Sequence, residues 1–130
     1  MPQREIDEVE AWLGAPLPEA WVSFLRRDRR LARGWLASGD YIWLESPAEA
    51  RELAEIGDED GERFPGRYRL GTDGSRDIYS VDLRHPELGV LLTDIVSEGW
   101  NDAEPLGLSV EEFIGRIDDG TFSRDVFPPR

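Results

Sequence analysis

Apolar side chains recur at helical spacing in four parts of the chain and at strand spacing in four others. Apolar stripes at three- and four-residue intervals, interrupted by proline or glycine, predict helices at the following positions: 5–13, 18–33, 47–56 and 110–119. Short apolar or alternating runs predict strands at these positions: 41–44, 67–70, 77–83 and 89–95. Residues 96–107, which contain Trp100, are predicted to form a loop.

Several element boundaries carry local signals. Ser46-Pro47-Ala48-Glu49 and Ser109-Val110-Glu111-Glu112 have the pattern of a capping box, in which a serine and a glutamate three residues later bond each other's backbone N–H. Gly57 and Gly120 occupy the usual glycine position after a helix. Asp73-Gly74 lies between two alternating segments and predicts a tight hairpin turn.

The alternation within residues 77–83 predicts a sheet that is buried on one side only. It places two sets of side chains on opposite faces: Tyr79, Val81 and Leu83 toward the core, and Ile78, Ser80 and Asp82 toward solvent.

The predicted order of elements is helix, helix, strand, helix, a run of antiparallel strands, and a last helix. This order is typical of an α+β domain in which helices pack against one antiparallel sheet. We find no repeat or linker pattern, so we expect a single domain over residues 1–120. The last ten residues, 121–130, end in Pro-Pro-Arg and are expected to form a loosely held tail.

The charge of the chain restricts its partners. The 130 residues include 28 Asp and Glu against 15 Arg and Lys, a formal net charge of −13, and every basic residue is Arg. Five arginines fall within residues 26–33, on the C-terminal half of the second predicted helix, where the helix dipole favours positive charge. Residues 85–115 contain seven acids and no Arg. This balance argues against binding to nucleic acid or anionic membranes. It fits a cationic protein partner, with the alternative that the acids serve only to keep the protein in solution.

Composition also excludes several kinds of chemistry. The chain has no Cys, which excludes disulfides, thiolate zinc sites and cysteine nucleophiles and fits a cytoplasmic location. No segment has the pattern of a membrane span or a secretory signal. His85 is the single imidazole, so neither a histidine metal site nor a catalytic triad is expected. The acidic run at 58–62 lacks the ligand spacing of a calcium loop. We therefore expect no metal and no cofactor.

Catalysis by paired carboxylates is a remaining alternative, with Asp73 and Asp77 beside the hairpin turn as the pair. Neither residue needs a catalytic role to explain its presence, because Asp is common in tight turns. We therefore expect a protein that is not an enzyme.

Three segments form an ordered set of motifs: Leu17-Pro18 with Trp21 and Phe24-Leu25, then Leu70 to Leu83, then Leu108 to Ile114. In this order they resemble the opening helix, the central hairpin and the closing helix of the SUKH superfamily. Family members often have an Asn-Gly-Gly-like loop after the second helix, where this chain has residues 28–34 with a different sequence. We therefore do not expect residues 28–34 of this chain to make the contacts that this loop makes in relatives.

The resemblance implies an α+β fold and a bacterial immunity protein, which binds and neutralises the cognate toxin of a polymorphic or contact-dependent secretion system. Many such toxins are nucleases, and we expect the partner of this acidic chain to be a basic one. A fungal branch of the family regulates cell-wall glucan synthesis, and it implies the alternative of a regulatory protein-interaction module with a non-toxin partner. Neither branch implies an enzyme.

An acidic surface would suit a basic toxin, and the candidate contacts lie mostly in the arginine-poor half of the chain. The expected partner-binding residues are Asp73, Asp77, Asp82, Asp94, Glu98, Trp100 and Asp102. Trp100 is the expected aromatic anchor, since interface hot spots favour Trp; packing within its own loop is the alternative. The oligomeric state is left open.

Overall fold

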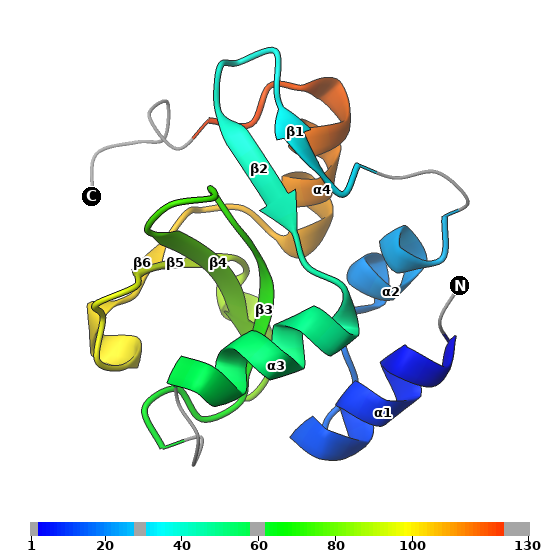
Figure 1. Cartoon of the computed structure of the whole chain (residues 1–130), viewed down its shortest axis with the longest axis vertical. Coiled ribbons are helices and arrows are strands. Elements are labelled where there is room, and N and C mark those ends of the chain that lie inside the picture. The colour runs from blue at the N-terminus through cyan, green and yellow to red at the C-terminus, as the bar shows by residue number, and fades with distance from the viewer. Residues whose placement is uncertain (1–2, 28–30, 58–61, 124–130) are drawn as a thin grey trace.

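The computed structural model describes residues 3–27, 31–57 and 62–123, and it confirms the α+β class (Figure 1). Its helices are α1 (Gln3–Leu13), α2 (Glu19–Leu25), α3 (Pro47–Gly57) and α4 (Val110–Asp119), with short 3-10 turns η1 (Pro86–Leu88) and η2 (Trp100–Asp102). Its strands are β1 (Arg33–Trp35), β2 (Tyr41–Leu44), β3 (Arg67–Thr72), β4 (Asp77–Asp82), β5 (Leu91–Asp94) and β6 (Glu104–Pro105).

The strands form one sheet in the order of the sequence, and every neighbouring pair is antiparallel. The register between β3 and β4 shifts between Arg69 and Gly71, which marks a bulge. Gly71 is required there because a Cβ would lie 2.5 Å from the carbonyl oxygen of Trp43 on β2. The absence of a side chain at Gly71 thus lets β2 approach β3 closely.

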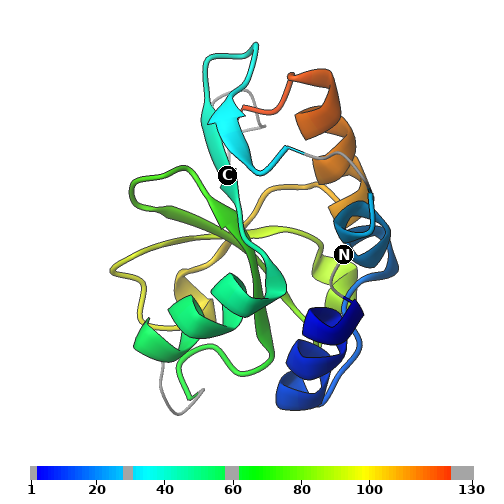
Figure 2. The same cartoon turned by 45° about the vertical axis from the view of Figure 1, so that its right-hand side comes forward.

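Helices cover the sheet on two sides. Figure 2 shows α1, α2 and α4 in a column along one side, while α3 crosses β3 and contacts α1, where Arg51 lies 5.2 Å from the centroid of the Trp12 ring. The main core lies beneath the column: the Trp21 Nε1–H on α2 donates a hydrogen bond of 3.1 Å to the Tyr68 hydroxyl on β3. On β4, Tyr79 packs against Phe113 of α4 and against Phe122, with ring centroids 5.6 and 5.4 Å away.

Phe122 corrects the expected start of the tail. It lies beyond α4, within the segment 121–130 expected to be loosely held, yet it is fully buried. Its carbonyl oxygen also accepts a hydrogen bond of 2.5 Å from the Ser38 hydroxyl in the β1–β2 turn. The folded part of the chain therefore includes Phe122, and the rest of the expected tail, from residue 124 on, lies outside the described residues.

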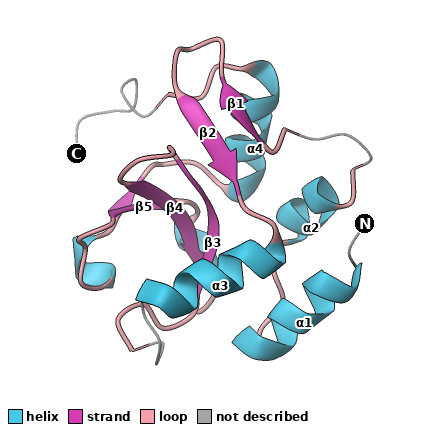
Figure 3. Ribbon diagram, in the orientation of Figure 1, coloured by secondary structure: helices cyan, strands magenta, loops and turns pink. Residues whose placement is uncertain are grey.

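The second helix is shorter than predicted, because α2 ends at Leu25 rather than near residue 33. Its apolar stripe of Trp21, Phe24 and Leu25 would continue at positions 28 and 29, and both are charged in the sequence. A longer helix would therefore turn two charged positions toward the core before it reached the next apolar residues, Leu31 and Ala32. The chain instead enters β1, an edge strand that the sequence reasoning missed (Figure 3).

The arginines near the end of α2 hold helices together. The Arg26 Nε–H donates to the Gln3 side-chain oxygen on α1 at 3.1 Å, and Arg27 pairs with Asp118 on α4 at 2.9 Å. Arg27 also lies over the Phe24 ring. These two members of the cluster therefore have a structural role, and residues 28–30 lie outside the described part of the chain.

Both predicted capping boxes are confirmed. The Glu112 N–H donates to the Ser109 hydroxyl at 3.1 Å, and the Ser109 N–H donates to the Glu112 carboxylate at 3.0 Å. These bonds to Ser109, backbone first, hold the pKa of Glu112 below its ordinary value. Ser46 and Glu49 make the same reciprocal pair at the start of α3.

The expectation that β4 is buried on one side only is wrong. Ile78, Ser80 and Asp82 are all buried, as are Tyr79 and Val81 on the other face. The second face is polar at its centre. Its buried polar and charged residues lie on three strands and just after a fourth: Glu45 after β2, Arg67 and Arg69 on β3, Ser80 and Asp82 on β4, and Thr93 on β5.

An ion pair stabilises this polar face. Arg69 donates from Nε and Nη2 to the two carboxylate oxygens of Glu45, at 2.8 and 2.6 Å. Both side chains are buried, so water cannot readily replace either partner. The bidentate hydrogen bonding between the guanidinium and the carboxylate is therefore important for offsetting the cost of burying the two charges.

Replacing Glu45 with Gln should lower the free energy of unfolding by about 3 kcal/mol, since it leaves the Arg69 charge buried without an opposite charge. The matched control is Glu55→Gln, which breaks the exposed Arg51–Glu55 pair on α3 and should cost about 0.5 kcal/mol or less. Urea denaturation of both variants measures the difference. Equal losses would contradict the role assigned to the buried pair.

Replacing Thr93 with Val should raise the free energy of unfolding by about 1 kcal/mol, because the buried Thr93 hydroxyl has no hydrogen-bond partner among the described residues. Thr72→Val is the control with the opposite sign, since the Thr72 hydroxyl accepts a hydrogen bond from the Gly74 N–H at 3.2 Å. Thermal or urea unfolding distinguishes the two, and a loss of stability in Thr93→Val would show that its hydroxyl is satisfied in solution.

Candidate partner-binding surface

Three of the predicted contact residues lie together at one end of the sheet. Asp73 lies in the β3–β4 turn, Asp77 begins β4, and Asp94 ends β5 directly across from Asp77 in the sheet register. One Asp73 carboxylate oxygen accepts the N–H of Ser75 at 2.8 Å and that of Asp77 at 3.1 Å. The tight turn predicted from Asp73-Gly74 is confirmed, and it fixes the position of Asp73.

One arginine lies among these carboxylates. Arg76 donates to Asp94 at 3.1 Å, and both side chains remain partly exposed. The hydrogen bond to Asp94 raises the pKa of Arg76 above its ordinary value, with a further contribution from the charges of Asp94 and Asp77. Three carboxylates against one guanidinium leave this end of the sheet negative.

Two apolar side chains protrude beside the acids. Ile95 is 58% exposed and Val96 is 67% exposed. The Ile95 N–H donates to the Arg76 carbonyl oxygen at 2.9 Å, and the Val96 N–H donates to Asp94 at 3.0 Å. These two hydrogen bonds fix the backbone of Ile95 and Val96 beside Arg76 and Asp94, and so they set where the apolar side chains protrude.

The apolar run at 89–95 predicts a strand that includes Ile95, so this exposed apolar pair was not expected. Strand β5 ends at Asp94, because that residue's N–H bonds the Ser97 hydroxyl at 3.0 Å while its carboxylate bonds the Val96 N–H. An Asp followed three residues later by Ser is a turn signal, and it could have predicted that Ile95 and Val96 lie in an exposed turn.

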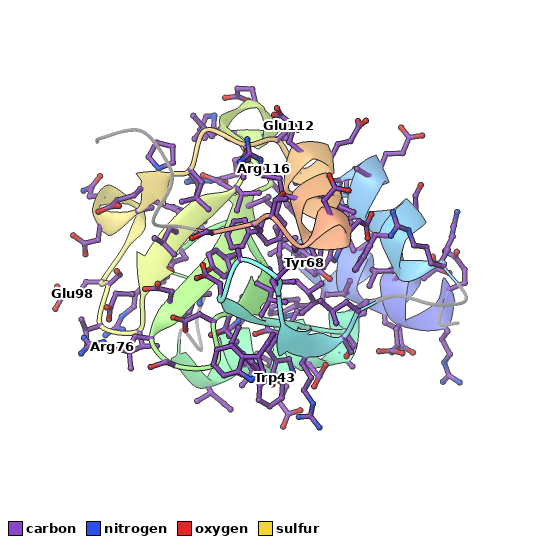
Figure 4. All side chains as sticks on the ribbon, turned by 90° about the horizontal axis from the view of Figure 1, so that it is seen from above. Trp43, Tyr68, Arg76, Glu98, Glu112 and Arg116 are labelled. Carbon is purple, nitrogen blue, oxygen red and sulfur yellow. The ribbon has the colours of Figure 1, made fainter. Side chains whose placement is uncertain are left out.

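Glu98 and Asp102 continue the acidic character along the next loop. Both are exposed, and the Glu98 N–H donates to Asp102 at 2.9 Å. Figure 4 shows Glu98 on the same side of the molecule as Arg76, away from Glu112 and Arg116. We name this surface the acidic sheet end, formed by Asp73, Arg76, Asp77, Asp94, Ile95, Val96, Glu98 and Asp102.

Asp82, also predicted as a contact, does not belong to this surface. It lies at the opposite end of β4 from Asp77 and is buried. Its two carboxylate oxygens accept hydrogen bonds from the Arg84 side chain at 3.1 and 3.0 Å. Burial and this pairing leave Asp82 inaccessible to a partner, because the alternation that placed it toward solvent does not hold on a sheet covered on both faces.

Trp100 is held by its own surroundings. Its side chain is half-buried, its ring meets Phe64 edge-on at a centroid distance of 5.3 Å, and its Nε1–H donates to the Pro65 carbonyl oxygen at 2.9 Å. The packing alternative considered from the sequence therefore accounts for Trp100.

The placement of titratable side chains among residues 3–27, 31–57 and 62–123 bears on metal binding in one respect. No group of three or more Asp, Glu or His side chains in this part is arranged to hold a metal ion. The Asp73 carboxylate is occupied by backbone N–H groups, and His85 is an exposed turn residue beside Glu87. Most of the acidic run 58–62 lies outside the described residues.

No protein-family model matches the chain, and no curated protein matches it. The SUKH resemblance therefore remains a prediction from the motifs. Within the described part of the chain, every helix is too short or too polar to cross a membrane.

Replacing Trp100 with Ala should lower the free energy of unfolding by about 2 kcal/mol, because it removes the ring contact with Phe64 and the bond to Pro65. Trp100→Phe keeps the ring contact and should cost about 1 kcal/mol. Urea denaturation measures both. Unchanged stability in Trp100→Ala would favour the anchor role that was expected from the sequence.

Proposed function

We propose that this chain is a non-catalytic immunity protein that uses the acidic sheet end to bind and neutralise a cognate bacterial toxin with a basic, nuclease-type surface. The observation that carries the binding site is the exposed pair Ile95 and Val96 among partly exposed or exposed carboxylates. The identity of the partner as a toxin rests on the SUKH resemblance.

The arrangement fits the general anatomy of a protein interface. Protein interfaces place apolar anchors at the centre of a contact and polar groups around it, where the surrounding contacts exclude water. Here Ile95 and Val96 supply the apolar area, and Asp73, Asp77 and Asp94 supply the adjacent charge. A cationic partner surface with a small apolar recess would satisfy both features.

The acidic sheet end is also ordered before binding. Asp73 is fixed by two backbone N–H groups, and Asp94 by Arg76 and the Val96 N–H. Such preorganisation favours affinity, because less side-chain entropy is lost on association. The net charge of −13 acts at longer range by steering a basic partner toward the protein before contact.

Co-purification tests the proposal directly. Tagged protein is isolated from its native cells at low and high salt, and bound proteins are identified by mass spectrometry. One dominant partner with a basic toxin domain, whose co-expressed toxicity this chain suppresses, would support the proposal. Several partners without toxic activity would contradict it and favour a regulatory interaction module. Retention of the toxin at high salt would assign most of the affinity to Ile95 and Val96 rather than to the acids.

Glu98→Lys should slow association with that partner by about fivefold at low salt, since reversing one charge at the rim of a contact is worth on the order of 1 kcal/mol. Asp119→Lys makes the same change in net charge on α4, on another side of the molecule, and should leave the association rate nearly unchanged. Stopped-flow or surface-based kinetics compare the two. Equal slowing by both variants would show that net charge, and not the acidic sheet end, governs capture.

A further inference from the structure

The two edges of the sheet are protected to different degrees. At one edge, β6 has two residues, the charged Glu104 and Pro105, and a proline has no N–H to offer another strand. At the other edge, β1 carries no proline and ends in Trp35, which is 76% exposed. Even a short edge strand can pair with another strand when it has no proline and carries a large exposed aromatic side chain.

The hydrogen bonds of β1 show which backbone groups face outward. The Leu44 N–H donates to the Ala32 carbonyl at 2.7 Å, and the Leu36 N–H donates to the Asp40 carbonyl at 2.8 Å. In an antiparallel ladder the residues that bond the neighbour alternate, so Gly34 also faces β2. The backbone N–H and C=O of Arg33 and Trp35 therefore face the outer edge, and among the described strands β1 pairs with β2 alone.

The side chains of β1 form an ordered aromatic and cationic face. The Arg33 guanidinium lies 4.9 Å from the ring centroid of Trp43, and the Trp35 ring meets Tyr41 edge-on at 5.1 Å. Arg33 and Trp35 are two residues apart in a strand, so they project to the same face of the sheet. Trp35 keeps most of its surface exposed despite the Tyr41 contact.

We propose that two copies of this chain associate by antiparallel pairing of their β1 strands, with a two-fold axis at Gly34. This register places Arg33 of each copy opposite Trp35 of the other, and each such pair exchanges two N–H···O=C bonds through the outward backbone groups. The guanidinium and indole then lie side by side on one face, where a cation–π contact is available. The same patch serves both copies, as two-fold symmetry requires.

Gly34 suits the axis. The two central residues form a closely spaced pair without hydrogen bonds, and glycine brings no side chain into that contact. Its φ of 156° is a value that other residues rarely adopt. Glycine at this position therefore fits both the local backbone and the approach of a second strand.

The association is expected to be weak and to strengthen with salt. A three-residue edge buries much less than the ~1,200 Å² of a standard stable interface, so the dimer depends on protein concentration. Each copy carries a charge of −13, and salt screens the repulsion between copies. Toxin capture by the acidic sheet end has the opposite salt dependence, so this proposal stands or fails independently of the proposed function.

Sedimentation equilibrium of the full chain tests for the dimer. The protein concentration is varied from about 10 µM to about 1 mM, and the NaCl concentration from about 50 mM to about 500 mM. The expected result is an average mass that rises from 14.8 kDa toward twice that value with protein concentration, and more steeply at high salt. A monomer under all conditions would overturn the proposal, as would self-association that weakens with salt.

Three variants locate the contact. Trp35→Pro removes an outward N–H without removing a bond to β2, and Trp35→Ala removes the ring; each should weaken association at least about tenfold, the expected scale for loss of a buried interface Trp. Trp12→Ala removes a partly exposed Trp from α1 and should leave association unchanged. Circular dichroism verifies folding. Dimers that persist in Trp35→Pro, or that are lost in Trp12→Ala, would assign the contact to another surface and overturn the proposal.

Discussion

The ion pair between Glu45 and Arg69 joins three parts of the molecule at a place that water does not reach. Glu45 lies between the end of β2 and the start of α3, and its N–H also extends the β2–β3 ladder by bonding the Leu70 carbonyl at 3.0 Å. Arg69 projects from the centre of β3. The pair therefore fixes where the chain leaves the sheet and how α3 crosses it. On the same polar face, Arg67 lies over the Phe64 ring, which in turn packs against Trp100.

The acidic sheet end depends on the same framework through the β3–β4 hairpin. The bulge at Gly71 and the bonds of Asp73 set the shape of the turn, and the register between Asp77 and Asp94 carries that shape to β5. Exposed charges and apolar side chains on a rigid sheet lose little freedom when a partner binds. The surface is therefore a product of strand register, and few of its contacts come from the helices.

The sequence predicted those elements whose local signals agreed with their packing. Alternation, capping boxes and Asp-Gly identified β2, β3, β4, α3 and α4, and they placed Asp73 and Asp77 together at one hairpin, whereas the register that sets Asp94 beside Asp77 appears only in the folded sheet. The failures have a common cause, since they depend on contacts between distant segments. The cover over the second face buried Asp82, the Phe64 ring engaged Trp100, and β1 formed only because β2 lay beside it. Such contacts leave little trace in the periodicity of a single segment.

The burial of Phe122 has a consequence for synthesis of the chain. Its ring completes an aromatic group with Tyr79 and Phe113, and its carbonyl bonds Ser38, more than eighty positions earlier. A nascent chain emerging from the ribosome can form its first helices and hairpins early, but this group closes only after residue 122 has left the exit tunnel. Completion of this core thus waits for the synthesis of residue 122, and nascent chains that end before it would expose the aromatic surface that Phe122 covers.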